Sequence, residues 1–110
     1  MKTLLEAIKQ LEEKQIKAKA NRKSVNYQVR DRANSEVYYN RSELFALYTA
    51  WYIVKHNADI DNTINQVMEV YKGDQGWNGY GDLRMVNAFT KKVKELIENE
   101  KALCTNRQDA

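Results

Sequence analysis

Hydrophobic side chains are densest between residues 40 and 57, in the stretch NRSELFALYTAWYIVKHN. At about 100° per residue, its apolar and aromatic side chains fall on every side of a helix. A helix that is apolar all round must be enclosed by other elements, and this one is shorter than the roughly 20 apolar residues that a bilayer requires. The pattern predicts a central core helix. Asn40 and Glu43 resemble a capping box at its start, and Asn57 suits a left-handed position at its end.

Three further stretches have the period of an amphipathic helix. Residues 3–20 carry the apolar stripe Leu4, Leu5, Ile8, Leu11 and Ile16. Residues 60–72 carry the stripe Ile60, Ile64, Val67, Met68 and Tyr71. We expect Asp59 or Asp61 to cap this helix and Gly73 to end it. Residues 82–102 carry the stripe Leu83, Val86, Phe89, Val93, Leu96 and Ile97, and we expect residues 105–110 to fray.

Residues 24–39 fit two patterns. Val25, Tyr27 and Val29 alternate with polar residues, which is the period of a strand. Residues 31–35 have turn chemistry and the stretch after them could return as a second strand. Helical spacing competes, because Val25, Val29, Ala33 and Val37 recur every fourth residue. We favour the hairpin, since Ser, Asn and β-branched residues form helices poorly.

The predicted fold class is therefore mainly α. About four helices pack around the central apolar helix at 40–57, and a β-hairpin lies at 24–39. The 110 residues form a single globular domain, since this is a common domain length. Cys104 is the only cysteine, which excludes an internal disulfide and favours a reducing compartment. Acidic residues appear by position 6, so the first residues do not resemble a signal peptide. We expect a cytoplasmic protein with no membrane association.

The charge is unevenly distributed. Residues 1–41 hold ten Lys and Arg against five Asp and Glu, whereas residues 42–110 hold eight against ten. The basic segment, residues 14–32, contains one acid, Asp31, and the seven cations Lys14, Lys17, Lys19, Arg22, Lys23, Arg30 and Arg32. Such a segment could bind nucleic-acid phosphates or steer docking onto an acidic protein. The simplest alternative is a solvated surface that happens to be basic.

All four glycines lie in residues 73–82, with Trp77 and Tyr80 between them. These glycines come after a predicted helix and not after a strand. Their pattern therefore fits neither the dinucleotide fingerprint nor the phosphate-binding loop. The segment is predicted to be an irregular loop. Trp77 and Tyr80 either fold back over the bundle or anchor a partner, as exposed aromatic residues often do.

No arrangement of residues points to catalysis or to a cofactor. His56 is the only histidine, which excludes a histidine cluster for a metal. It could act as a general base with Asp59 or Asp61, but no nucleophile is predicted beside it. The pattern Asp59-x-Asp61-Asn62 lacks the glycine and the later acid of an EF-hand loop, and it is explained by helix capping. We expect no enzyme, no metal and no cofactor.

The leading hypothesis is a small non-enzymatic binding protein. It would dock on a protein of nucleic-acid metabolism or defence and modulate or inhibit it. The small size, the lack of proline and the abundance of Asn, Lys and Tyr are of the kind found in accessory proteins of phages and mobile elements. The second hypothesis is direct DNA or RNA binding by the basic segment. The third is a self-associating structural protein, which could form a homodimer. The expected contact residues are Lys14, Lys17, Arg22, Lys23, Tyr27, Arg30, Arg32, Trp77 and Tyr80.

Overall fold

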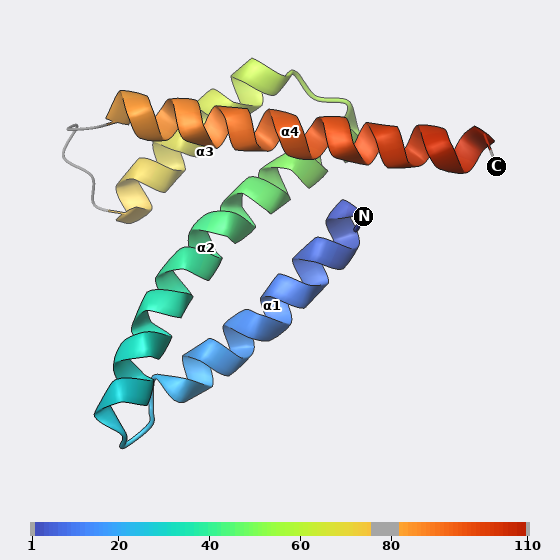
Figure 1. The fold of residues 1–110 in the computed structure, drawn as a ribbon. Helices are drawn as coiled ribbons and strands as arrows, with labels where there is room; N and C mark the ends of the chain where they lie inside the picture. The colour runs from blue at the N-terminus through green and yellow to red at the C-terminus, as the bar shows by residue number, and fades with distance from the viewer. Residues whose placement is uncertain (1, 76–81, 110) are drawn as a thin grey trace.

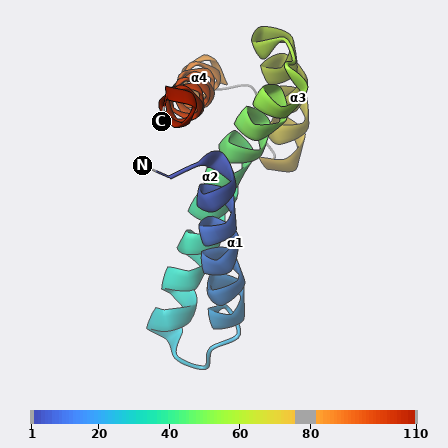
Figure 2. The same ribbon diagram turned by 90° about the vertical axis from the view of Figure 1, so that its right-hand side faces the viewer.

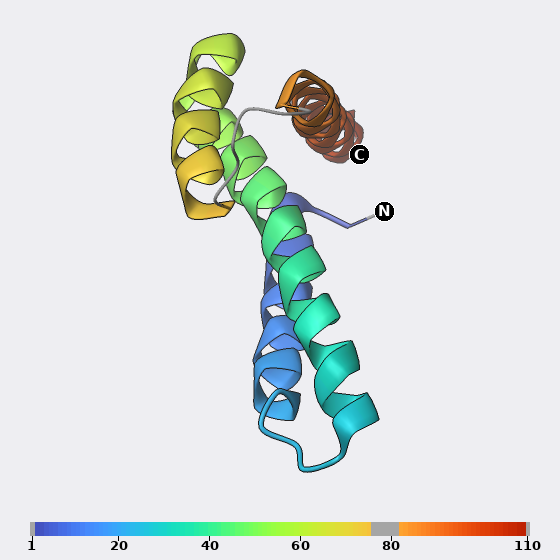
Figure 3. The same ribbon diagram turned by 90° about the vertical axis from the view of Figure 1, so that its left-hand side faces the viewer.

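In the computed structural model of the chain, the regular secondary structure of the described residues is entirely α-helical (Figure 1). It describes the backbone of residues 2–75 and 82–109 and the side chains of residues 2–70 and 86–103. The helices are α1 (Leu4–Asn21), α2 (Tyr27–His56), α3 (Ile60–Gln75) and α4 (Asp82–Asp109). α1 and α2 form a helical hairpin, and α3 and α4 lie on either side of the C-terminal end of α2 (Figures 2 and 3). A mainly α fold is thus confirmed.

The β-hairpin predicted at 24–39 is wrong, because these residues form the turn after α1 and the first part of α2. The Asn26 side chain accepts hydrogen bonds from the amides of Gln28 and Val29, at 3.0 and 3.2 Å, and so caps the start of α2. The predicted capping box is also wrong, since Asn40 lies inside α2. Of the four residues with the competing four-residue spacing, Ala33 is buried, whereas Val25 lies in the turn before α2 and is 99% exposed.

The main core lies where α1, α3 and α4 meet the C-terminal half of α2. α2 contacts each of the other three helices. The buried cluster consists of Leu4, Ile8, Leu11, Leu44, Ala46, Leu47, Ala50, Ile53, Ile64, Met68, Val93 and Ile97. The sequence predicted that other elements enclose residues 40–57 on every side, and the structure does not show this. The Tyr48 and Tyr52 side chains remain 44% and 49% exposed.

α1 is held by a face that differs from the predicted stripe. Leu4, Ile8 and Leu11 are buried, but Ile16 is 69% exposed, and Gln15 and Ala18 are buried in its place. At the start of α1, the Leu4 amide donates a 2.6 Å hydrogen bond to the Glu100 carboxylate. A carboxylate there satisfies a free amide and interacts favourably with the helix dipole. The first helix is thereby attached to the last.

The connection between α2 and α3 follows the sequence prediction. Asn57 has a φ of 51° and a ψ of 43°, the left-handed conformation expected after α2. The Asp59 carboxylate accepts a 2.7 Å hydrogen bond from the Asn62 amide and caps α3. The predicted ends are too early, because α3 continues past Gly73 to Gln75 and α4 continues to Asp109.

Within the described residues, no helix is long and apolar enough to cross a membrane.

Candidate binding surfaces

The hairpin of α1 and α2 extends away from α3 and α4 as a projecting arm, which we define as residues 15–39 (Figure 1). Its two helices meet through small or polar side chains. Ala18 and Ala33 are 1% and 2% exposed, and the third buried residue of the arm is Gln15. No arm residue belongs to the main core cluster of the described chain. The arm therefore presents most of its side chains to solvent.

The seven cations of the basic segment are all exposed, and six of them lie on the arm. In the described part of the chain, none of the seven forms an ion pair with a carboxylate. Two have other contacts. The Arg22 Nε donates to the Asn34 side chain at 3.1 Å, and the Arg30 guanidinium lies 5.7 Å from the centre of the Tyr27 ring. The arm therefore carries a surplus of positive charge that the described chain does not neutralise.

The tip of the arm also exposes apolar side chains. Val25 is 99% exposed, Tyr27 68% and Val29 40%. Single exposed apolar residues are common. Tyr27 and Val29 are two residues apart in α2 and so lie on different sides of the helix, but all three side chains stand within the last turn of the arm and are available for contact there. We call Val25, Tyr27 and Val29 together with Lys23, Arg30 and Arg32 the tip surface. It combines the apolar and cationic groups that a protein interface needs.

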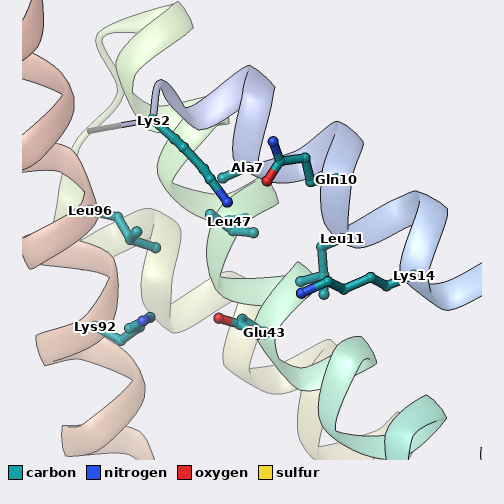
Figure 4. Close-up of a pocket in the computed structure, with 9 residues that line it drawn as sticks. All are labelled: Lys2, Ala7, Gln10, Leu11, Lys14, Glu43, Leu47, Lys92 and Leu96. Carbon is teal, nitrogen blue, oxygen red and sulfur yellow. The ribbon is translucent and has the colours of Figure 1, made fainter.

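Lys14 is separated from the tip surface. It lines a cleft of about 200 Å³ between α1, α2 and α4, together with Lys2, Glu43 and Lys92 (Figure 4). Figure 4 shows the Glu43 carboxylate and the Lys92 amino group turned toward this opening. The basic segment is thus not one patch, because Lys14 faces α4 while the tip surface lies at the far end of the arm.

Trp77 and Tyr80, the two remaining candidate contact residues, lie outside the described residues. Of the glycine-rich segment that holds them, the structure describes the backbone up to Gln75 and from Asp82.

A second surface lies along α2, where the sequence predicted core. One hollow of about 460 Å³ lies between α1 and α2, and a second of about 360 Å³ lies between α2 and α3. Phe45 and Tyr48 line both hollows, so the two are adjacent, and Tyr52 extends the second. We call the two hollows together the aromatic groove. Three of its lining side chains, Phe45, Tyr48 and Tyr52, are aromatic and come from α2.

The charge of the aromatic groove is concentrated at one end. Lys19, Arg22 and Arg41 line the first hollow, whereas the second is lined by neutral side chains alone, including Thr63, Gln66 and Val67.

Tyr48 lies between these two parts. Burial raises its pKa, and the negative charge of Glu12 raises it further. Tyr48 is therefore a neutral hydroxyl at physiological pH.

The groups considered for catalysis have other contacts. The His56 ring packs on the Tyr52 ring, with their centres 4.6 Å apart. Asp59 caps α3, and the Asp61 carboxylate lies 3.6 Å from the Lys94 amino group. Over the ranges that the structure describes, no group of three or more His, Cys, Asp or Glu is placed to hold a metal ion.

Sequence reasoning missed the aromatic groove because it assigned the aromatic residues of 40–57 to the core. Phe45, Tyr48 and Tyr52 follow one another at intervals of three and four, so they share one side of the helix. This spacing is visible in the sequence. The spacing alone does not show that the flanking helices leave part of this side uncovered.

Comparisons of this chain with family models, with curated proteins and with solved structures each return no match.

Proposed function

We propose that this chain is a non-enzymatic binding protein that docks on an acidic surface of another protein and modulates that protein's activity. The observation that carries the proposal is the tip surface, where three exposed apolar side chains stand among cations that have no carboxylate partner in the described chain. In keeping with the composition, we propose a partner from nucleic-acid metabolism or defence.

Each kind of group at the tip has a separate role in this proposal. Val25 and Tyr27 supply apolar area, which drives association when it is removed from water. Tyrosine is also among the residues that most often dominate binding energy at interfaces. Lys23, Arg30 and Arg32 attract an acidic partner over a distance and so raise the rate of productive encounters.

Direct binding of DNA or RNA by the arm is the second candidate. The Arg30–Tyr27 pair favours it, since cations and aromatic rings together bind phosphates and bases. Two observations favour a protein partner instead. The tip exposes apolar side chains, which make no favourable contact with a phosphate backbone. Lys14 also faces a different cleft from the tip cations.

The test is an affinity capture from source-cell lysate with the full chain, in nuclease-treated and untreated halves. We compare the natural chain with an arm variant carrying Lys23→Gln, Arg30→Gln and Arg32→Gln. We expect a stoichiometric protein that survives nuclease. Its association rate with the arm variant should fall roughly tenfold at low salt and much less at high salt, because screening removes the attraction.

The matched control carries Lys9→Gln, Lys91→Gln and Lys101→Gln, which remove the same charge from exposed positions off the arm. We expect this control to keep most of the association rate. Equal rates for the arm variant and the natural chain would contradict the proposal. Loss of the captured proteins after nuclease treatment would instead support nucleic-acid binding, with an affinity that falls steeply as salt rises.

A further inference from the structure

We propose that the aromatic groove binds an amphipathic α-helix of a protein partner, with acidic residues at the end of that helix that lies against α1. This inference rests on the proposed function in one respect, that the partner is a protein. It concerns a different surface from the tip and therefore has its own test.

The dimensions of the groove suit a helix. Its α2 residues run from Val37 to Tyr52, which is a rise of about 22 Å at 1.5 Å per residue. A helix of about 15 residues covers that length. Its apolar residues, at intervals of three and four, would lie on Phe45, Tyr48 and Tyr52, which have the same intervals. Val67 of α3 adds apolar surface on the far side.

The charge of the groove sets the polarity of the occupant. Lys19 and Arg22 stand at the α1 end, and neutral residues line the α3 end. A helix with Asp or Glu at one end and neutral residues at the other matches this distribution.

A single strand of nucleic acid fits the groove less well, although aromatic rings also stack on bases. Each nucleotide brings a phosphate, so a strand needs cations along its whole path, and the groove has them at one end only. Glu12 adds negative charge near the middle, close enough to Tyr48 to raise the pKa of its hydroxyl. These charges favour a helix whose acidic residues are confined to one end.

The test uses the full chain and a displayed library of 16-residue peptides. Each peptide carries apolar residues at helical spacing and random residues elsewhere. We expect selection to enrich Asp and Glu at one end. Tyr48→Ser should weaken binding of the enriched peptides at least about tenfold, because it removes an aromatic ring that lines both hollows. Tyr39→Ser is the matched control, since Tyr39 is exposed but lines neither hollow.

A charge exchange provides the second arm of the test. A chain with Lys19→Glu and Arg22→Glu should lose affinity for the enriched peptides and gain it for versions with Lys in place of the acidic residues. Circular dichroism verifies that each variant keeps its helical content. A gain of this kind cannot result from misfolding.

Five outcomes would overturn the inference, the first four of them in the binding assays. These four are the absence of any enrichment, enrichment without acidic residues at one end, full affinity in Tyr48→Ser, and tighter binding of a 20-nucleotide oligo-dT that Tyr48→Ser abolishes. A concentration-dependent dimer that Tyr48→Ser disrupts would likewise overturn it, by assigning the groove to a second copy. The arm variant should keep full peptide affinity, so failure of the groove and failure of the tip are distinguishable.

Discussion

The Gln15 side chain is buried between α1 and α2, and only one end of its amide group has a hydrogen-bond partner. Its Nε2 donates a 3.1 Å hydrogen bond to the Val37 carbonyl, while its Oε1 is buried and has no partner among the described residues. A hydrogen bond contributes about 0.5–1.5 kcal/mol net, whereas a buried acceptor without a partner costs about 1–3 kcal/mol. Methionine has a similar length and no such acceptor. We therefore expect Gln15→Met to raise the free energy of unfolding by about 1 kcal/mol.

The Val37 carbonyl does not lose its only partner in this variant, because a carbonyl inside a helix also accepts from the amide four residues later. Unfolding entropy is about 2.1 cal/mol/K per residue. For 110 residues, a gain of 1 kcal/mol corresponds to a rise in Tm of about 4 °C. Thermal and urea unfolding followed by far-ultraviolet circular dichroism measures the change, and an unaltered urea m-value shows that the unfolded state is unaffected.

Gln10→Met is the matched control, since Gln10 is exposed on the same helix. We expect it to leave stability within about 0.5 kcal/mol of the natural chain. A loss of 1 kcal/mol or more in Gln15→Met would refute the reasoning, because it would mean that both halves of the Gln15 amide make favourable interactions.

Three further predictions each concern a single residue. Glu100→Gln should lower stability by about 0.5–1 kcal/mol in a urea titration, because it removes the charge beside the Leu4 amide; exposed Glu98→Gln should have little effect. Asn57→Ala should cost about 1 kcal/mol for its left-handed backbone and Asn57→Gly should not; equal losses would contradict this. Burial raises the pKa of Tyr48 above its usual 10.0, so its contribution to stability is complete below that pH and is lost as pH rises through the folded-state value. In alkaline unfolding, Tyr48→Phe should therefore lose less stability than the natural chain.

The sequence predicted the connection between α2 and α3 from local chemistry. Asn57 and Asp59 have the conformation and the capping role expected of them. Residues 24–39 were assigned to a hairpin because Val25, Tyr27 and Val29 alternate with polar residues. The assignment was wrong because the described chain has no neighbouring strand to bury them. The decisive residues were Asn26, which caps α2, and Ala33, which is small enough for α1 to approach closely. Neither is distinctive until α1 is in place.

The candidate surfaces divide in the same way. Exposure of the basic segment could be predicted, because isolated lysine and arginine side chains are rarely buried. The aromatic groove could not, since the exposure of Tyr48 and Tyr52 depends on how α1 and α3 flank α2. The exposure of Ile16 and the burial of Gln15 have a related cause. The turn at residues 22–26 sets which face of α1 contacts α2. That face is not the one with the strongest hydrophobic stripe.

The unbroken course of α2 has a consequence for any partner. Its 30 residues contain neither glycine nor proline, so Tyr27 at the tip and Tyr52 in the aromatic groove are held about 38 Å apart on one helix. A partner attached at the tip would present its own helix to the groove at an effective concentration of order millimolar when the spacing matches. Two weak attachments would then act as one bivalent attachment. A partner with another spacing would gain only one of them, so the length of α2 would itself select among partners.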